Sequence, residues 1–318
     1  MFELGTGTGW NAALLALRAG PGQVTSVEVD PRLAGAAGLR LDAVDARVRV
    51  KVGDGTAGWP PYAPYDRVIS TYAVDRIPWS WVAQTRPGGR IVTPWGRLGH
   101  VALTVAEDGR SATGWIQGLA QFMPARGTFS GPDDFSQVRG DAPAPDKRPW
   151  ERDLGPLRDD WHLRFALRVA LPDVRITVAA DDDGLNAWLH DGITSWAALS
   201  AVENGKTLAH QGGPRRLADE LEQAWEGWLE ADKPDLYDYG LTVEPEHQYA
   251  WAHDADTGWP LTPADGLCPT RAAQLTCHIR SHDHSGPSAC PGPQGMVDVG
   301  RNGGIVECVA DPSQATAA

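Results

Sequence analysis

Apolar runs of strand length alternate with helical segments along residues 1–127 of the 318-residue chain. From this pattern, strands are predicted at Phe2–Leu4, Val24–Val29, Arg47–Val52, Arg67–Ser70, Arg90–Pro94, His100–Ala106 and Gly114–Leu119. Helices are predicted between them at Asn11–Arg18, from Pro31 onward and at Pro78–Gln84. This alternation is typical of an α/β fold in which helices connect the strands of a parallel sheet.

The remainder of the chain divides into three parts. Residues 128–154 are rich in Gly, Pro, Asp and Ser and are predicted to be a linker. Residues 155–260 are predicted to form an α+β domain with no role assigned. Its strands are predicted at Asp173–Ala179 and Thr194–Ser200, an amphipathic helix at Gly213–Leu229 and a terminal hairpin at Val243–Trp251. Residues 261–318 contain no aromatic residue and are predicted to be a disordered tail.

Charge and composition exclude several classes of function. The chain has 28 basic and 41 acidic side chains, a net charge of −13, and no basic block, which argues against nucleic acid as a partner. No apolar run reaches the roughly 18–20 residues of a membrane helix, and the first residues lack the pattern of a signal peptide. All four cysteines follow residue 265, so a disulfide framework is not expected. We therefore expect a cytoplasmic protein without a membrane partner; its oligomeric state is not indicated.

A glycine-rich loop joins the first predicted strand to the first predicted helix. It reads Glu3-Leu4-Gly5-Thr6-Gly7-Thr8-Gly9. Glycine allows a sharp turn and the close approach of a ligand, and the free N–H groups at a helix start favour a polar or anionic group. Dinucleotide and nucleotide binders share such loops, so the loop alone is not specific.

Three acidic residues near strand ends make the prediction sharper. Glu3 precedes the loop and is placed to receive a cationic group, and Glu28 closes the second strand, where it can accept both hydroxyls of a ribose. Asp54 follows the third strand and can accept from an adenine amino group. An adenosine with a cationic amino-acid tail is S-adenosyl-L-methionine. The predicted cofactor-binding residues are Glu3, Gly5, Thr6, Gly7, Thr8, Gly9, Glu28, Asp54 and Gly55.

Residues 1–127 resemble the protein-L-isoaspartate O-methyltransferase family. The resemblance lies in the segments Gly5–Gly9, Glu28, Gly53–Gly55 with Gly58-Trp59, and Arg86–Val92 with Pro94 and Gly96. It is greatest to divergent members that have an additional C-terminal region and act in the maturation of peptide natural products. It implies a Rossmann-like, seven-stranded methyltransferase sheet that transfers a methyl group to an aspartyl or isoaspartyl carboxylate of a peptide or protein.

The implied chemistry requires positioning more than acid–base catalysis. A carboxylate is already ionised at neutral pH, so the enzyme has to align the reactants and exclude water. The acceptor is expected beyond the carboxyl end of the fourth strand, where Thr71 and Tyr72 are predicted to position it. No metal site is predicted. The same segment, Ser-Thr-Tyr-Ala-Val, does not resemble the Asn-Pro-Pro-Tyr element of adenine-N6 methyltransferases.

The beginning of the chain departs from the family pattern. Family members have an N-terminal segment whose helices cover the cofactor and whose serine-bearing loop lies at the acceptor. Here only four residues precede Gly5. We therefore expect either a truncated gene model or fragment, or a lid supplied from elsewhere, and impaired turnover in the former case.

Several alternatives remain open at this point. The chain is interpreted either as an active methyltransferase, as a degenerate methyltransferase domain that only binds a partner, or as an enzyme acting on a small molecule. A nicotinamide-binding site is disfavoured by Glu3 and by the Asp54 motif. Asp181–Gly184 is expected to be a solvated turn, and Trp79 and Trp81 are expected in the core. The tail lacks the spacing of a zinc site, so its Cys and His residues are expected to be unstructured: Cys268, Cys277, His278, His282, His284, Cys290 and Cys308.

Overall fold

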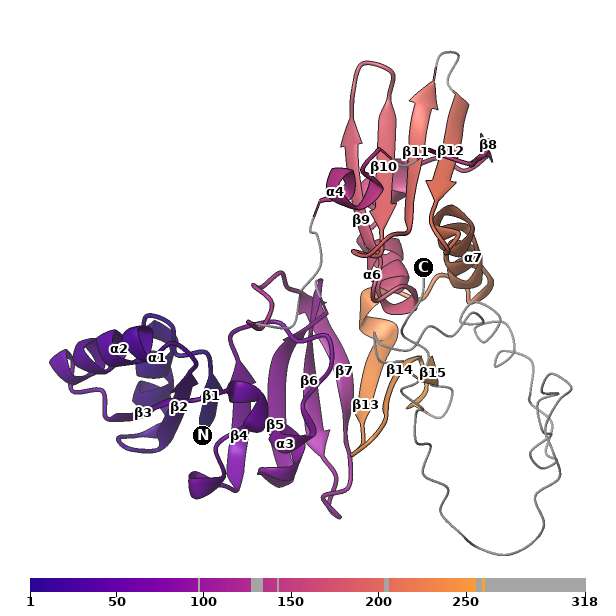
Figure 1. The fold of residues 1–318 in the computed structure, drawn as a ribbon. Coiled ribbons are helices and arrows are strands. Elements are labelled where there is room, and N and C mark those ends of the chain that lie inside the picture. Colours follow the sequence, from indigo (N-terminus) through magenta and orange to yellow (C-terminus); the bar gives the residue numbers. More distant parts are fainter. Residues whose placement is uncertain (97, 127–133, 142, 203–205, 256–258, 261–318) are drawn as a thin grey trace, which may run out of the picture. The chain divides into compact units, whose positions relative to one another are not determined.

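The computed structural model of the chain describes residues 1–96, 98–126, 134–141, 143–202, 206–255 and 259–260, and the predicted tail 261–318 lies outside them. The described strands form two sheets (Figure 1). The first has the order β15-β14-β13-β7-β6-β5-β4-β1-β2-β3. Its strands are β1 (Phe2–Leu4), β2 (Val24–Glu28), β3 (Val48–Val52), β4 (Tyr65–Ser70), β5 (Thr85–Trp95), β6 (Gly99–Val105), β7 (Ala112–Leu119), β13 (Tyr239–Val243), β14 (Gln248–Ala252) and β15 (Trp259–Pro260).

Strands β1 to β5 are parallel and are connected by helices or turns of helix. Both β1 and β2 are buried along their whole length, as expected for strands covered on two faces. The helices of this part are α1 (Trp10–Ala19), α2 (Pro31–Ala43) and α3 (Trp79–Ala83). Helix α2 begins where Asp30 accepts hydrogen bonds from the two backbone N–H groups that follow Pro31. The predicted Rossmann-like α/β fold is confirmed, and the carboxyl ends of β1 to β4 meet at one edge.

The first sheet also contains strands from the far end of the described chain. Strand β13 pairs antiparallel with β7, with Gly240 opposite Trp115, and β14 and β15 continue the sheet. The Trp251 ring lies over Gly240, where an added Cβ atom would come within 2.1 Å of the ring. The same ring packs edge-on against the Trp115 ring, with 4.4 Å between the two ring centroids. The predicted boundary at residue 127 is therefore not a boundary of the sheet, because these strands belong to the predicted domain 155–260.

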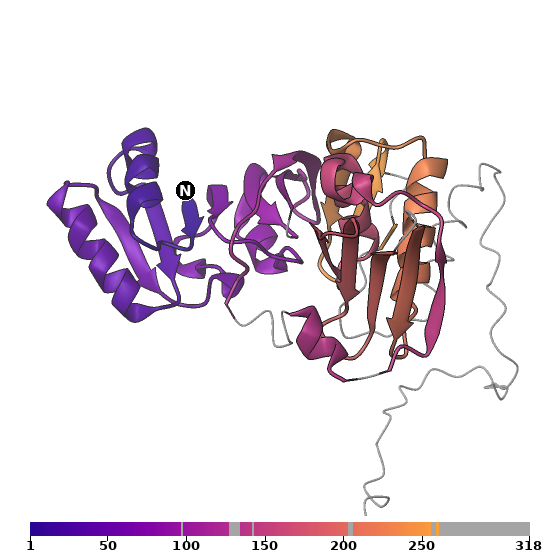
Figure 2. The same cartoon turned by 90° about the horizontal axis from the view of Figure 1, so that it is seen from above.

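The second sheet is antiparallel and has the order β8-β12-β11-β10-β9 (Figures 1 and 2). Its strands are β8 (Asp146–Trp150), β9 (Arg175–Ala180), β10 (Leu185–His190), β11 (Trp196–Val202) and β12 (Lys206–Gly212). The nearby helices are α4 (Phe135–Arg139), α5 (Gly155–Asp159), α6 (Trp161–Ala170) and α7 (Leu217–Glu230). Strand β8 and helix α4 lie within the predicted linker 128–154, so part of that segment has regular structure.

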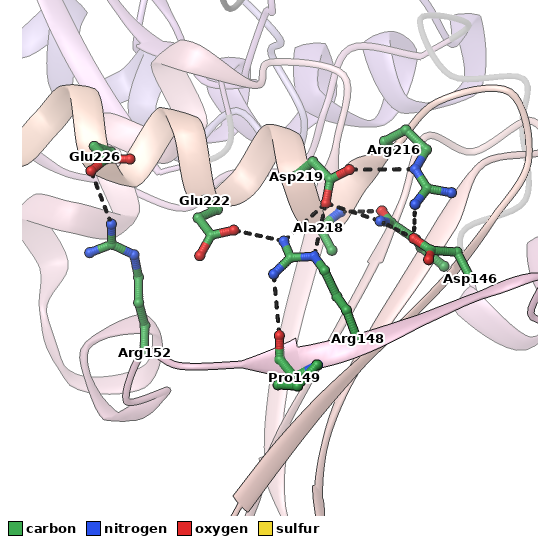
Figure 3. A network of polar contacts seen from close by, with 10 residues as sticks. Asp146, Arg148, Pro149, Arg152, Arg216, Ala218, Asp219, Glu222 and Glu226 are labelled. Atoms are coloured by element: carbon green, nitrogen blue, oxygen red, sulfur yellow. Dashed lines mark hydrogen bonds and ion pairs between the residues drawn. The ribbon is translucent and has the colours of Figure 1, made fainter.

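A polar network attaches β8 to α7 (Figure 3). The Arg148 guanidinium donates to Asp219 at 2.9 Å and to Glu222 at 2.7 Å. Gln211, which is 1% exposed, donates to Asp146 at 2.9 Å and accepts from the Ala218 backbone N–H at 3.0 Å. Both polar atoms of the Gln211 side chain therefore have partners, and the network joins the edge strand β8 to β12 and α7.

Replacing Asp219 with asparagine is expected to weaken the acid sensitivity of the fold. Burial opposes ionisation of Asp219, but hydrogen bonds from Gln211 and Arg148 outweigh it and hold the pKa below the usual range. A carboxyl with a lowered folded-state pKa stabilises the fold above its unfolded pKa of about 4, and this contribution is lost as the pH falls through the folded value. Urea unfolding should therefore show a smaller loss of stability below about pH 4 for Asp219→Asn than for the unmodified chain.

The exposed Asp42 of α2 provides the matched control for this measurement. Asp42→Asn measures what the loss of one exposed carboxyl group does to the pH dependence. An Asp219→Asn variant with the same pH dependence as the Asp42→Asn variant would contradict the role assigned to the network.

Candidate functional site

The glycine-rich loop turns at the carboxyl edge of the first sheet. The backbone N–H groups of Gly5 and Thr6 both donate to the Val27 carbonyl of β2, at 2.9 and 3.2 Å. Gly5, Gly7 and Gly9 have positive φ values of 89°, 54° and 87°. These are backbone conformations that residues with a side chain rarely adopt, so the loop favours glycine at each position.

The three glycines differ in what surrounds them. A Cβ atom at Gly5 would lie 2.5 Å from the Thr71 hydroxyl, and one at Gly9 would contact helix α2 at 3.3 Å. At Gly7, no heavy atom of the described residues lies within 4 Å of such a Cβ. The space beside Gly7 is open to a ligand, as expected for the loop. Beside Gly5 and Gly9, other parts of the protein occupy the corresponding space.

Glu3 is enclosed by protein and is 0% exposed. One carboxylate oxygen accepts a hydrogen bond from the Asn11 amide at 2.7 Å, and the other accepts from the Ser26 hydroxyl at 2.5 Å. Ser26 in turn lies 2.6 Å from the hydroxyl of the buried Thr6. The carboxylate thus connects the start of α1 with β2 beneath the loop, which differs from the expected direct contact with a cationic ligand.

Replacing Glu3 with glutamine is expected to change how stability depends on pH. Burial raises the pKa of Glu3, and the hydrogen bonds from Ser26 and Asn11 oppose this rise only in part. Because the folded pKa lies above the unfolded value of about 4, the stability associated with the protonated group is lost as the pH rises through the folded pKa. Glutamine has no such proton to lose, and the Ser26 hydroxyl can turn to accept from its amide.

Urea unfolding at about pH 4 and about pH 7 tests this prediction. Relative to the unmodified chain, Glu3→Gln should become more stable as the pH is raised. The control is Glu107→Gln, at an exposed position in the turn between β6 and β7. If the difference in stability between Glu3→Gln and the unmodified chain is the same at both pH values, ionisation of Glu3 opposes folding no more than that of an exposed glutamate.

Glu28 lies at the end of β2 and is 7% exposed. One carboxylate oxygen accepts from the Gly7 backbone N–H at 2.9 Å, and the other accepts from the Asp30 N–H at 3.1 Å. Each carboxylate oxygen can accept further hydrogen bonds. Glu28 therefore holds an acceptor beside the one glycine of the loop that faces open space.

Asp54 follows β3 and is exposed. It accepts from the Thr56 N–H at 2.9 Å and so caps the short 3-10 helix Gly55–Ala57. The indole N–H of Trp81 donates to the Gly55 carbonyl at 2.8 Å from the buried side. Trp81 is in the core, as expected, and it supports the turn that presents Asp54.

Tyr72 lies between the loops that follow β1 and β3. A Cβ atom at Gly5 would approach its ring at 3.0 Å, and one at Gly55 would approach its phenolic oxygen at 2.4 Å. Burial raises the pKa of Tyr72, and the negative charges of Asp54 and Glu28 raise it further. The structure thus brings Tyr72, Glu28 and Asp54 into one neighbourhood, whereas the Glu3 carboxylate is held beneath the loop.

Thr71 faces the backbone of β1. Its hydroxyl lies 2.7 Å from the Gly5 carbonyl and 3.1 Å from the Leu4 carbonyl, and its single proton is shared between these two acceptors. Its own N–H donates to the Leu4 carbonyl at 2.9 Å. Thr71 therefore holds the glycine-rich loop in place, and its contact with an acceptor stays a prediction.

A segment that the sequence did not indicate runs beside the end of β4. The Ala73 N–H donates to the Met123 carbonyl at 2.8 Å, and the Ala125 N–H donates to the Ala73 carbonyl at 2.9 Å. Met123 is 81% exposed, and Phe122 is half-exposed. Arg126 lies 3.6 Å from the Asp30 carboxylate at the start of α2. In the sequence, the adjacent apolar residues Phe122 and Met123 shortly before the predicted linker are the signal that could have indicated this segment.

Other candidate sites are not supported within the part of the chain that the structure describes. There, no group of three or more His, Cys, Asp or Glu residues is arranged to hold a metal ion. Asp181 accepts from the Asp183 and Gly184 N–H groups at 3.0 and 3.1 Å, as in a turn. The Cys and His residues of the tail lie outside the described residues. None of the described helices has the length and apolarity needed to cross a membrane.

Comparison with known proteins identifies similarity in the N-terminal part of the chain. Residues 1–122 match the model of the family described as protein-L-isoaspartate(D-aspartate) O-methyltransferase (PCMT). A protein-L-isoaspartate O-methyltransferase of Anaeromyxobacter dehalogenans is 42% identical over 129 residues, which are 40% of this chain and 59% of the relative. A second, from Anaeromyxobacter sp. strain Fw109-5, is 45% identical over 110 residues, which are 34% of this chain and 51% of the relative.

A solved structure named protein-L-isoaspartate O-methyltransferase aligns with 80% of this chain and 75% of its own, with 20% identity and a TM-score of 0.45. The chain spans about half to three fifths of the length of the two relatives from Anaeromyxobacter. The sequence similarity covers the glycine-rich loop, Glu28, the Asp54 turn and Tyr72, all of which lie within residues 1–122.

Proposed function

We propose, from the match of residues 1–122 to the protein-L-isoaspartate O-methyltransferase family model, that this chain binds S-adenosyl-L-methionine and methylates an aspartyl or isoaspartyl carboxylate of a peptide or protein. The observation that carries the proposal is the open space at Gly7 beside the Glu28 carboxylate, with Tyr72 next to Gly5 and to Gly55, the residue after Asp54. Two acceptors for neutral hydroxyl and amino groups, next to a backbone that a ligand can approach closely, fit a nucleoside without a phosphate.

The residues present fit this cofactor. Glu28 would accept from the ribose hydroxyls, and Asp54 would accept from the adenine amino group, since each has acceptor capacity beyond its backbone contact. Glu3 would act through Asn11 and Ser26, which it holds beneath the glycine-rich loop. The bound cofactor supplies an electrophilic methyl group on a sulfonium.

The acceptor side is formed by Tyr72 and the segment beside Ala73. An acceptor carboxylate is ionised at neutral pH and needs no general base. The Tyr72 phenol is protonated at neutral pH, as tyrosine ordinarily is, and its raised pKa keeps it protonated at higher pH as well. It can therefore donate a hydrogen bond that orients a carboxylate. The exposed Met123 places apolar surface next to this position, where it would exclude water. Thr71 supports the loop from behind.

The net charge of −13 favours a peptide or protein over nucleic acid as the acceptor. A cytoplasmic location is part of this proposal.

Methylation of defined peptides tests the proposed function. The full chain is incubated with S-adenosyl-L-methionine and matched peptides that contain isoaspartate, aspartate or asparagine at one position. Mass spectrometry should show the gain of one methylene mass on a carboxylate-containing peptide and none on the asparagine peptide, and mild base should reverse it. Binding of S-adenosylhomocysteine without transfer to any peptide would contradict the proposal and favour a binding protein.

A further inference from the structure

The loop that follows β4 is joined to the hairpin formed by β13 and β14. The Ile77 N–H donates to the Gln248 side-chain oxygen at 3.0 Å, and the Gln248 side-chain N–H donates to the Ile77 carbonyl at 2.6 Å. The two residues are 171 positions apart in the sequence, and Gln248 is 5% exposed. The Gln248 side-chain amide thus forms with the Ile77 backbone the same pair of hydrogen bonds that the backbone of a neighbouring strand would form.

This pair of hydrogen bonds completes the attachment of the loop. The Val74 N–H donates to the Pro94 carbonyl at 3.2 Å, and the Val74 carbonyl accepts from Gly96 at 2.9 Å. The Asp75 carbonyl accepts from the Trp95 indole at 3.2 Å. Ile77 itself is 1% exposed, so its backbone groups would be buried without partners if the Gln248 amide were absent.

The hairpin that carries Gln248 is itself firmly attached to the first sheet. Gln248 pairs with Val243 of β13, and β13 pairs with β7. The indole N–H of Trp251, which is buried, donates to the Thr242 hydroxyl at 3.1 Å. Residues of the predicted C-terminal domain therefore reach the loop that begins at Thr71 and Tyr72, through a rigid element.

We propose that Gln248 is a positioning residue for the acceptor side of the site, a role that rests on the proposed methyl transfer. It fixes Ile77, and the loop from Ile77 back to β4 fixes the direction in which Tyr72 faces. Residues 239–252 would thereby have a role in the reaction although they lie outside the part of the chain that matches the family. The proposed cofactor contacts come from the glycine-rich loop and the ends of β2 and β3, whereas Gln248 bonds to Ile77. We therefore expect Gln248 to act on the acceptor side of the site.

Gln248→Met, which keeps the side-chain volume but removes both hydrogen bonds, is the first test. In the full chain, kcat/KM for an isoaspartyl peptide should fall about tenfold or more, because a small misplacement of the acceptor lowers the rate steeply. The Kd of S-adenosylhomocysteine should be unchanged, and amide hydrogen exchange of residues 73–77 should be faster. The control is Gln117→Met, an exposed glutamine of β7.

Gln248→Glu adds a readout that a purely structural role would not change. Its ionised carboxylate still accepts from the Ile77 N–H but has no proton for the Ile77 carbonyl, and protonation restores that donor. The kcat/KM of this variant, divided by that of the unmodified chain, should therefore rise as the pH falls. A variant that only disturbed packing would give a ratio independent of pH.

The two proposals fail in different ways. If the unmodified chain methylates no peptide, the proposed function is wrong, and hydrogen exchange still decides whether Gln248 holds the loop. If Gln248→Met matches Gln117→Met in both kcat/KM and exchange of residues 73–77, the role of Gln248 is wrong whatever the chain methylates.

Discussion

Gly5→Ala should abolish detectable binding of S-adenosylhomocysteine and lower the free energy of unfolding by about 2–4 kcal/mol. Gly5 has φ +89°, a conformation that disfavours any side chain. The added methyl group would lie 2.5 Å from the Thr71 hydroxyl, which donates to the carbonyl of Gly5 itself. Relief of this overlap requires the loop to move away from Thr71, and that movement displaces Gly7 from Glu28.

The control also has a positive φ at its glycine but lacks the overlap. Gly109 has φ +69° in the turn between β6 and β7, and none of the described heavy atoms lies within 4 Å of a Cβ placed there. Gly109→Ala should lower the free energy of unfolding by about 1 kcal/mol and leave binding unchanged. Urea unfolding and calorimetric titration measure both quantities. Equal effects of the two substitutions would show that contact with Thr71 does not constrain the loop.

Glu28→Ala should weaken the binding of S-adenosylhomocysteine by about 10- to 100-fold, because hydrogen bonds to a charged acceptor contribute about 1.5–3 kcal/mol. The substitution removes the proposed ribose contact and also the acceptor of the Gly7 N–H. Glu28→Gln keeps one acceptor oxygen, so its binding should be intermediate. The effect on the free energy of unfolding should be smaller than that of Gly5→Ala, since water can replace the lost acceptor.

Glu107→Ala removes an exposed carboxylate from the turn between β6 and β7 and serves as the control for charge. It should bind S-adenosylhomocysteine as the unmodified chain does. If Glu28→Ala binds as tightly as Glu107→Ala, the ribose is not held at the end of β2.

The part of the fold that follows from local pattern was predictable. Strands β1 to β7 were expected from their apolar residues, although β5 is longer than the expected Arg90–Pro94, and α2 was expected because Pro31 marks its start. The addition of β13 to β7 was not expected. It depends on a pairing between residues such as Gly240 and Trp115, about which the hydrophobic pattern of either segment carries no information.

The candidate site was predictable where a backbone requirement shows in the sequence. The positive φ values of Gly5 and Gly7 are an example, because few other residues tolerate them. The directions of side chains were not predictable. Glu3 faces Asn11 and Ser26, and Thr71 faces β1, because their partners are set by the register of β1 against its neighbours. Gln248 depends on a contact 171 residues away.

A crystal structure of the full chain with S-adenosylhomocysteine tests the proposed cofactor site most directly. We predict that both ribose hydroxyls lie within hydrogen-bond distance of the Glu28 carboxylate. The adenine should lie beside Asp54, and the nucleoside should contact the glycine-rich loop at Gly7. A nucleoside bound elsewhere, with Glu28 contacting only the Gly7 and Asp30 N–H groups as it does here, would contradict the account.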